Sequence, residues 1–213
     1  LLDYAKAGCS IYNSAKMTLE EVLEVMLRDV REDKQVVRLH TGDPCLYGAI
    51  REQMDVLDEE KIPYDYCPGV SSFCGAASAL NLEYTLPEIS QSVIITRMAG
   101  RTPVPEKESI ESFAAHHATM VVFLSTGLLE ELSRRLIDGG YSADTPAAIV
   151  YKATWEDEKS FVCTVGTLAE TAKKNNITKT ALMIIGDVVN CSHYDRSKLY
   201  DPGFTTEFRE ASK

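Results

Sequence analysis

Apolar residues recur three and four positions apart in several stretches of the chain, which is the spacing of one face of a helix. The clearest such face consists of Leu19, Val22, Leu23, Met26 and Val30. Thr18 and Glu21 form the sequence of a capping box, so we expect this helix to begin directly after Thr18. The other predicted helices lie at 50–57, after 68–72, at 128–137 and at 167–174.

Short runs of apolar and β-branched residues predict strands between these helices. The predicted strands are 35–40, 64–67, 92–96, 119–124, 147–151, 160–165 and 181–185. In the first part of the chain, strand, loop and helix follow one another twice, an order that favours a parallel sheet. Proline and polar residues interrupt the pattern at 84–90. We therefore expect an α/β protein with two α/β domains, residues 1–88 and residues 89–213, the second ending in a surface tail.

The composition narrows the classes of partner. Hydrophobic residues make up 45% of the 213 residues and the formal net charge is −10, which disfavours a nucleic-acid partner because such partners need a basic face. No apolar run has the length of a membrane span. The six cysteines form no C-x-x-C pair, so we expect buried free thiols in a reducing cytoplasm and no metal site.

The loop Thr41–Gly48 is the first candidate site, because open α/β sheets place ligands at the carboxyl ends of their strands. Gly42 permits close approach of the backbone to a ligand, and Asp43 offers a carboxylate to hydroxyl groups or cations. The same residues fit a turn in which Asp43 only caps the next helix. The pattern does not decide between these two interpretations.

Other positions are equally open. The loop 68–72, with Ser71 and Ser72, fits both a set of amides and hydroxyls facing a ligand and a plain helix cap, which is the more ordinary arrangement. His40 adjoins the first loop and is a weaker candidate. Trp155 fits both a core position and a contact with a large planar ligand.

Two arginines flank a glycine in the loop TRMAGRTPVPE. Arg97 and Arg101 lie in a proline-stiffened segment of an acidic protein, and forked guanidinium groups suit the recognition of carboxylates. The alternative is a solvated loop whose arginines pair with Glu106 or Glu108. We interpret both arginines as candidate anchors for an acidic substrate.

Taken together, these segments resemble the tetrapyrrole methyltransferase family. The stretches that carry the resemblance are VVRLHTGDPCLYGAI, CPGVSS, TRMAGRTPVPE, VVFLSTGLL, VYKATWEDEK and SKLYDPGFTTEFRE. TGDPxxYG and PGVSS are typical of the whole family, whereas TRxxGRTPVPE with YKATWxDEK is narrower. The narrower pair points to the branch that methylates C11 of precorrin-4 or cobalt-precorrin-4 in cobalamin biosynthesis.

The resemblance implies a cytoplasmic homodimer of two-domain subunits that binds S-adenosyl-L-methionine in the cleft between the domains and releases S-adenosyl-L-homocysteine. It implies a tetrapyrrole substrate, with no metal in the protein and no identified catalytic base. Arg97 and Arg101 would bind the carboxylate side chains of that substrate. The implied cofactor contacts are Thr41, Gly42, Asp43, Leu46, Ser71, Ser72, Ser125 and Ala153.

One feature of the family has no counterpart in the sequence. The family opens with a strand and a loop of the type G-x-G-P-G-D, and neither precedes Leu1. We therefore expect the N-terminal domain to be incomplete at its start and to bind the cofactor more weakly than a full-length enzyme. Two alternatives stay open: a related methyltransferase acting at another tetrapyrrole position or on rRNA, and a non-catalytic binding module.

Overall fold

A computed structural model describes residues 2–212 and confirms an α/β protein. The chain forms two compact units, one up to Ser71 and one from Ser72 onward. The α-helices are α1 (Leu19–Arg31), α2 (Arg51–Glu59), α3 (Ser72–Ala79), α4 (Ile110–Ala114), α5 (Leu129–Asp138) and α6 (Leu168–Lys174). The strands are β1 (Val93–Arg97), β2 (Thr119–Phe123), β3 (Pro146–Tyr151), β4 (Lys159–Thr164) and β5 (Ala181–Ile185).

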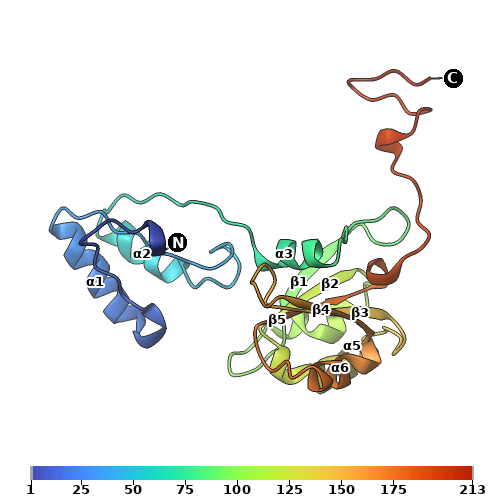
Figure 1. Ribbon diagram of the computed structural model, residues 1–213, viewed down its shortest axis with the longest axis horizontal. Helices are drawn as coiled ribbons and strands as arrows, with labels where there is room; N and C mark the ends of the chain where they lie inside the picture. Colours follow the sequence, from blue (N-terminus) through green and yellow to red (C-terminus); the bar gives the residue numbers. More distant parts are fainter. Residues whose placement is uncertain (1, 213) are drawn as a thin grey trace. The chain divides into compact units, whose positions relative to one another are not determined.

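Helices α1 and α2 form the first unit (Figure 1). The capping box is confirmed: Thr18 Oγ1 accepts from the Glu21 N–H, and the Glu21 carboxylate accepts from the Thr18 N–H. Val22 and Met26 of α1 pack against Leu57 of α2 in a small core. The apolar spacing in the sequence thus predicts both the helix and its buried face.

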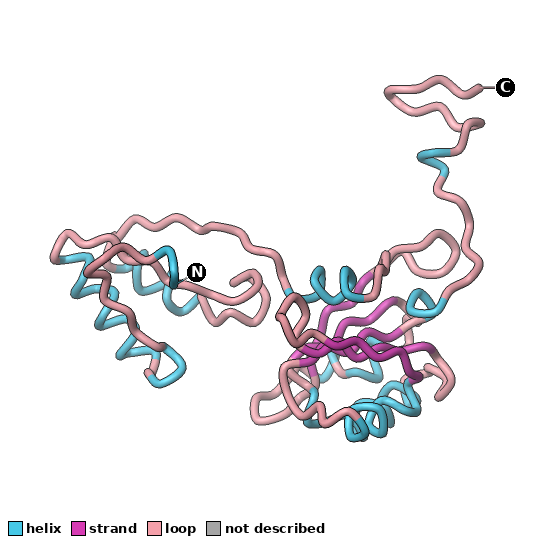
Figure 2. Tube along the Cα trace, viewed as in Figure 1, coloured by secondary structure: helices cyan, strands magenta, loops and turns pink. Residues whose placement is uncertain are grey.

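The strands predicted at 35–40 and 64–67 are wrong. Both segments are loops, and the first unit in Figure 2 carries only helix and loop colours. Val37 and Leu39 are 70% and 44% exposed, so the apolar residues of 35–40 do not face a sheet. A strand exists only where a neighbour completes its ladder of hydrogen bonds, and these segments are not paired with one another in the described residues. The parallel sheet predicted for this part is absent from residues 2–71 for the same reason.

The second unit contains a five-stranded mixed sheet in the order β1-β2-β5-β3-β4. β1 and β2 are parallel, whereas β2–β5, β5–β3 and β3–β4 are antiparallel. β5 is antiparallel to both β2 and β3, so β1, β2 and β3 all run in the same direction. Their carboxyl ends therefore meet at one edge of the sheet, where open α/β sheets place their ligands.

Helices cover both faces of this sheet (Figure 1). Alternate residues of the central strands separate into two cores, so Met120 and Val122 face α5 and α6, while Val121 faces α3. All five residues of β2 and of β5 are buried. Burial on both faces gives a strand the continuous apolar run that the sequence shows.

Helix α3 belongs to the second unit by its contacts. Its Ala76 is fully buried with Val121, and the Tyr84 hydroxyl donates to the Phe73 carbonyl at 2.7 Å. The Thr119 hydroxyl donates to the Tyr84 carbonyl at 2.9 Å. These bonds tie 72–84 to the sheet, so the compact units divide at 71–72. The domain boundary expected at 88–89 stays a prediction.

Candidate functional site

The carboxylate of Asp43 joins the first loop to the loop 68–72. Its Oδ1 accepts from the Cys45 N–H at 2.9 Å and from the Tyr66 hydroxyl. Its Oδ2 accepts from the Gly69 N–H at 2.9 Å. Helix α2 begins instead after Ile50, so the interpretation of Asp43 as a helix cap is wrong. Oδ2 retains one acceptor position for a ligand, because each carboxylate oxygen has two lone pairs.

Two glycines bring these loops into close contact. A Cβ on Gly69 would lie 2.1 Å from the Gly42 carbonyl oxygen, closer than any real contact. Gly42 itself has φ +65°, a backbone conformation that favours glycine. The two loops therefore meet backbone to backbone, with the Asp43 side chain beside the contact.

The hydrogen bonds fix the charge state of this pair. The Tyr66 hydroxyl, followed by the Cys45 and Gly69 N–H groups, stabilises the carboxylate and holds the pKa of Asp43 well below its usual range. The same bond raises the pKa of Tyr66 to about 12. At neutral pH, Asp43 is ionised and Tyr66 is a neutral phenol. The stabilisation from Asp43 is present above its usual pKa and is lost only as the pH falls through its lower folded value.

The other predicted residues between His40 and Ser72 differ in accessibility. Thr41 and Gly42 are exposed, and Leu46 is half-buried on the same loop. Ser71 is 7% exposed, and Ser72, the first residue of α3, is exposed. His40 is half-buried, and its burial, together with the charge of Arg38, lowers the pKa of His40.

Ser125 follows β2 and joins it to the end of β1. Its hydroxyl is buried, accepts from the Met98 N–H at 2.9 Å and donates to the Phe123 carbonyl at 2.6 Å. The donor and one of the two acceptor positions of the hydroxyl are thus used within the protein. Ser125 is 1% exposed, so in this structure its hydroxyl holds the ends of β1 and β2 together.

Replacing Ser125 with alanine is expected to lower the free energy of unfolding by about 1–3 kcal/mol, because the Met98 N–H loses its acceptor in a buried position. Urea denaturation followed by circular dichroism measures the change. Ser112→Ala is the matched control, because Ser112 is exposed on α4. Equal stability of the two variants would show that the buried bond contributes nothing.

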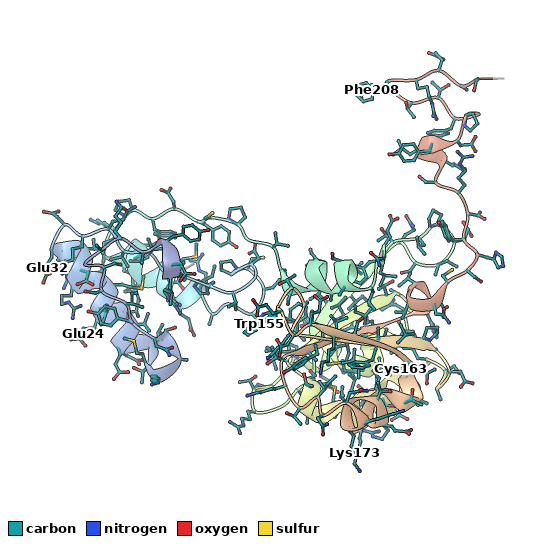
Figure 3. The ribbon with its side chains drawn as sticks, viewed as in Figure 1. Glu24, Glu32, Trp155, Cys163, Lys173 and Phe208 are labelled. Atoms are coloured by element: carbon teal, nitrogen blue, oxygen red, sulfur yellow. The ribbon has the colours of Figure 1, made fainter. Side chains whose placement is uncertain are left out.

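Ala153 lies in the loop between β3 and β4, at the same edge of the sheet as Ser125. It packs on the core beneath α3, and a Cβ on Gly75 would lie 3.4 Å from the Ala153 Cβ. The Lys152 ammonium lies 5.2 Å from the Trp155 ring centroid and bonds to Asp157. Figure 3 shows the Trp155 side chain on this loop, and 58% of it is exposed, so the core interpretation of Trp155 is wrong.

The two arginines after β1 have different environments. The Arg97 guanidinium donates to the carbonyls of Thr102 at 3.2 Å and Pro103 at 2.7 Å, and so closes its own loop. Arg101 lies in that closed loop and is exposed. No salt bridge joins either arginine to Glu106 or Glu108 within the part of the chain that the structure describes. Arg97 therefore shapes the loop that presents Arg101.

The six cysteines are free, but the prediction that they are buried is wrong for those on exposed loops and on α3: Cys9, Cys45, Cys67 and Cys74. Across the described positions, no group of three or more His, Cys, Asp or Glu side chains is arranged to hold a metal ion. None of the described helices combines the length and apolar character that crossing a membrane requires.

Sequence reasoning missed Tyr66. It lies in a segment that the pattern assigns to a strand, where a tyrosine is an ordinary strand residue. Its partner Asp43 is 23 positions away, and no local pattern connects them.

The geometry and motifs agree with comparisons with known proteins. Residues 2–169 match the family of Tetrapyrrole (Corrin/Porphyrin) Methylases. The chain belongs to this family. The cobalt-precorrin-4 C(11)-methyltransferase of Methanocaldococcus jannaschii is 50% identical over 213 residues, which are 100% of this chain and 82% of that protein.

Two solved structures of tetrapyrrole methylases are also similar. A cobalt precorrin-4 methyltransferase described as a cobalamin biosynthetic enzyme has a TM-score of 0.87 and 43% identity over 89% of this chain and 80% of that one. The uroporphyrin-III C-methyl transferase of Thermus thermophilus, complexed with S-adenyl homocysteine, has a TM-score of 0.67 and 25% identity. The match covers 80% of this chain and 74% of the chain in that structure. The resemblance stated from the motifs is thereby confirmed.

Proposed function

We propose that this tetrapyrrole methylase is an S-adenosylmethionine-dependent C-methyltransferase that methylates C11 of precorrin-4 or cobalt-precorrin-4. The observation that carries the proposal is 50% identity over the whole chain to a cobalt-precorrin-4 C(11)-methyltransferase. The motif TRMAGRTPVPE supports the same branch of the family. Its first arginine, Arg97, closes the loop after β1.

The proposed cofactor contacts are Thr41, Gly42, Asp43, Leu46, Ser71, Ser72, Ser125 and Ala153. Their chemistry fits the cofactor. Gly42 and Ala153 leave room for a bulky ligand, Leu46 offers an apolar surface, and Asp43 Oδ2 keeps an acceptor position for a hydroxyl or amino group. When bound, S-adenosylmethionine supplies a methyl group on a positively charged sulfonium.

The chemical step needs positioning more than an acid or a base. The methyl donor is already activated, and orientation alone reaches effective molarities on the order of 10⁵–10⁸ M. This chain would contribute by fixing the loops after β1 and β2 at one edge of the sheet, as the bonds of Arg97 and Ser125 do. The site has no need of a catalytic dyad for this reaction.

We propose that Arg101 binds the carboxylate side chains of the tetrapyrrole. It is exposed in a loop whose shape Arg97 fixes, on a protein of net charge −10. Arg97 remains a second candidate contact, although three of its hydrogen bonds go to carbonyls of its own loop.

Arg101→Ala is expected to raise the KM for the tetrapyrrole by about ten- to a hundredfold, because hydrogen bonds to a charged group are lost. The affinity for the cofactor should change little. Arg101→Lys should restore only part of the loss, because an ammonium cannot make a forked contact with a carboxylate. Steady-state kinetics with varied tetrapyrrole measures both variants. Wild-type KM values in both would remove Arg101 from the substrate site.

The decisive experiment is a methyl-transfer assay on the purified protein with labelled S-adenosylmethionine. Precorrin-4 and cobalt-precorrin-4 are offered separately, and the position of the new methyl group is read by NMR. Transfer to C11 supports the proposal, and comparison of the two substrates shows which one the enzyme prefers. Transfer to another ring position would favour a related methylase activity. Binding of S-adenosylhomocysteine without transfer to either substrate would favour a non-catalytic module.

We also propose a cytoplasmic homodimer. The six free cysteines suit a reducing compartment. Sedimentation equilibrium of the protein tests the dimer through its mass. A mass near 23.6 kDa at all concentrations would contradict it.

A further inference from the structure

The Asp43 carboxylate is the centre of a small hydrogen-bonded cluster. Tyr66 contributes a hydroxyl that donates to Asp43 Oδ1 and accepts from the Cys45 N–H at 3.1 Å. The Cys45 N–H also donates to Asp43 Oδ1 at 2.9 Å, and the Gly69 N–H donates to Asp43 Oδ2 at 2.9 Å. The hydroxyl of Tyr66 thus completes a closed set of contacts between the first loop and the segment that leads to Gly69.

Three hydrogen bonds join 41–48 to 66–70: Cys45 N–H to the Tyr66 hydroxyl, the Tyr66 hydroxyl to Asp43 Oδ1, and Gly69 N–H to Asp43 Oδ2. Each of these three bonds has Asp43 or Tyr66 as a partner. The backbones of the two loops also approach closely, because a Cβ on Gly69 would lie 2.1 Å from the Gly42 carbonyl oxygen. A rotation of the Asp43 carboxylate would break its bond with the Gly69 N–H and so remove one of the contacts between the loops.

Tyr66 is well placed to prevent that rotation. A carboxylate turns about its terminal bond with little resistance, because this kind of torsion has a broad energy profile. Gly69 fixes Oδ2, and the Tyr66 hydroxyl with the Cys45 N–H fixes Oδ1. Hydrogen bonds to an ionised acceptor are about twice as strong as those between neutral groups.

We propose that Tyr66 is a positioning residue of the cofactor site, which acts through Asp43 to hold the loops 41–48 and 68–72 in the arrangement that receives S-adenosylmethionine. The inference rests on the proposed function, since these loops carry the proposed contacts from Thr41 to Ser72. Tyr66 itself need not touch the cofactor. Its hydroxyl sets the orientation of Asp43, and Asp43 sets the separation of the two loops.

The test uses Tyr66→Phe, which removes the hydroxyl and keeps the ring. The affinity for S-adenosylhomocysteine, measured by titration calorimetry, should fall by about tenfold, the loss of one hydrogen bond to a charged group. The KM for S-adenosylmethionine should rise by the same factor, with kcat unchanged at saturation. Tyr64→Phe is the matched control, because Tyr64 lies two residues away and is 39% exposed against 40% for Tyr66.

A double-mutant cycle separates action through Asp43 from an independent effect. In the Asp43→Ala background, Tyr66→Phe should change the affinity by less than about twofold, because the group through which it acts is gone. The same tenfold loss in both backgrounds would overturn the inference, as would an unchanged affinity of the single variant. A loss in Tyr64→Phe equal to that in Tyr66→Phe would also overturn it.

Amide hydrogen exchange tests the same contact without the cofactor. Exchange at Gly69 and Cys45 should accelerate in Tyr66→Phe and stay unchanged in Tyr64→Phe. A wild-type protein that binds no S-adenosylhomocysteine would contradict the proposed function. Accelerated exchange in that case would still establish Tyr66 as the residue that holds the loops, and unchanged exchange would overturn the inference independently.

Discussion

Leu132→Ala is expected to lower the free energy of unfolding of the second unit by about 2–5 kcal/mol, the range for removing a buried leucine side chain. Leu132 lies in the middle of α5, is fully buried and packs with Met120, Ile149 and Met183 in the core beneath one face of the sheet. Its loss removes apolar area and leaves a cavity that the surrounding strands fill only in part. Urea denaturation, followed by circular dichroism, measures the change.

The matched control for that variant lies on the same helix. Ile137 is 40% exposed, so Ile137→Ala removes a side chain of the same size from a position that is much less buried. We expect it to cost well under half of the Leu132 effect. Similar losses in the two variants would contradict burial as the source of the Leu132 contribution, since alanine has the higher helix propensity in both replacements.

Asp43→Ala is expected to weaken the binding of S-adenosylmethionine by about ten- to a hundredfold, corresponding to roughly 1.5–3 kcal/mol for bonds to a charged group. The variant loses the contacts of Cys45, Tyr66 and Gly69 with the carboxylate together with any direct contact to the cofactor. The helices of both units are untouched, so the far-ultraviolet circular dichroism spectrum should not change. Calorimetric titration with S-adenosylhomocysteine gives the affinity.

Asp65→Ala is the control for the loss of a negative charge, because Asp65 is exposed and adjoins Tyr66 in the sequence. Affinity equal to that of the wild type in Asp43→Ala would remove Asp43 from the cofactor site. The pKa of Asp43 lies below its usual range, so Asp43 stays ionised near neutral pH. The affinity of the wild-type protein for S-adenosylhomocysteine should therefore not change there through this group. Its contribution should disappear only in acid, as the pH falls through the folded pKa.

The sequence predicts the second unit most closely where burial is complete. The run 181–185 coincides with β5, and 119–124 contains β2, because strands buried on both faces are apolar at every position. The capping box at Thr18 is equally local, since both of its hydrogen bonds join residues three positions apart. The motifs around Asp43 and Arg101 also identify the family, which the comparisons confirm.

The sequence alone is least informative where a residue depends on a distant partner. The apolar and β-branched residues at 35–40 predict a strand, yet a strand needs a neighbouring strand, which the local sequence does not supply. Arg97 and Arg101 are equivalent in the sequence, and only the folded loop gives Arg97 the carbonyls of Thr102 and Pro103 while leaving Arg101 exposed.

Sequence by itself thus determined the family, the α/β class and the buried strands, because these follow from motifs and from apolar patterns within a few residues. Tertiary structure decided the direction of strand pairing and the use of each polar side chain. Ser125 and Asp43 illustrate the difference: both belong to motifs, but their hydrogen-bond partners Met98 and Gly69 lie 27 and 26 positions away. A donor or acceptor bonds to the group that lies within hydrogen-bond distance in the folded protein. The path of the whole chain determines which group that is.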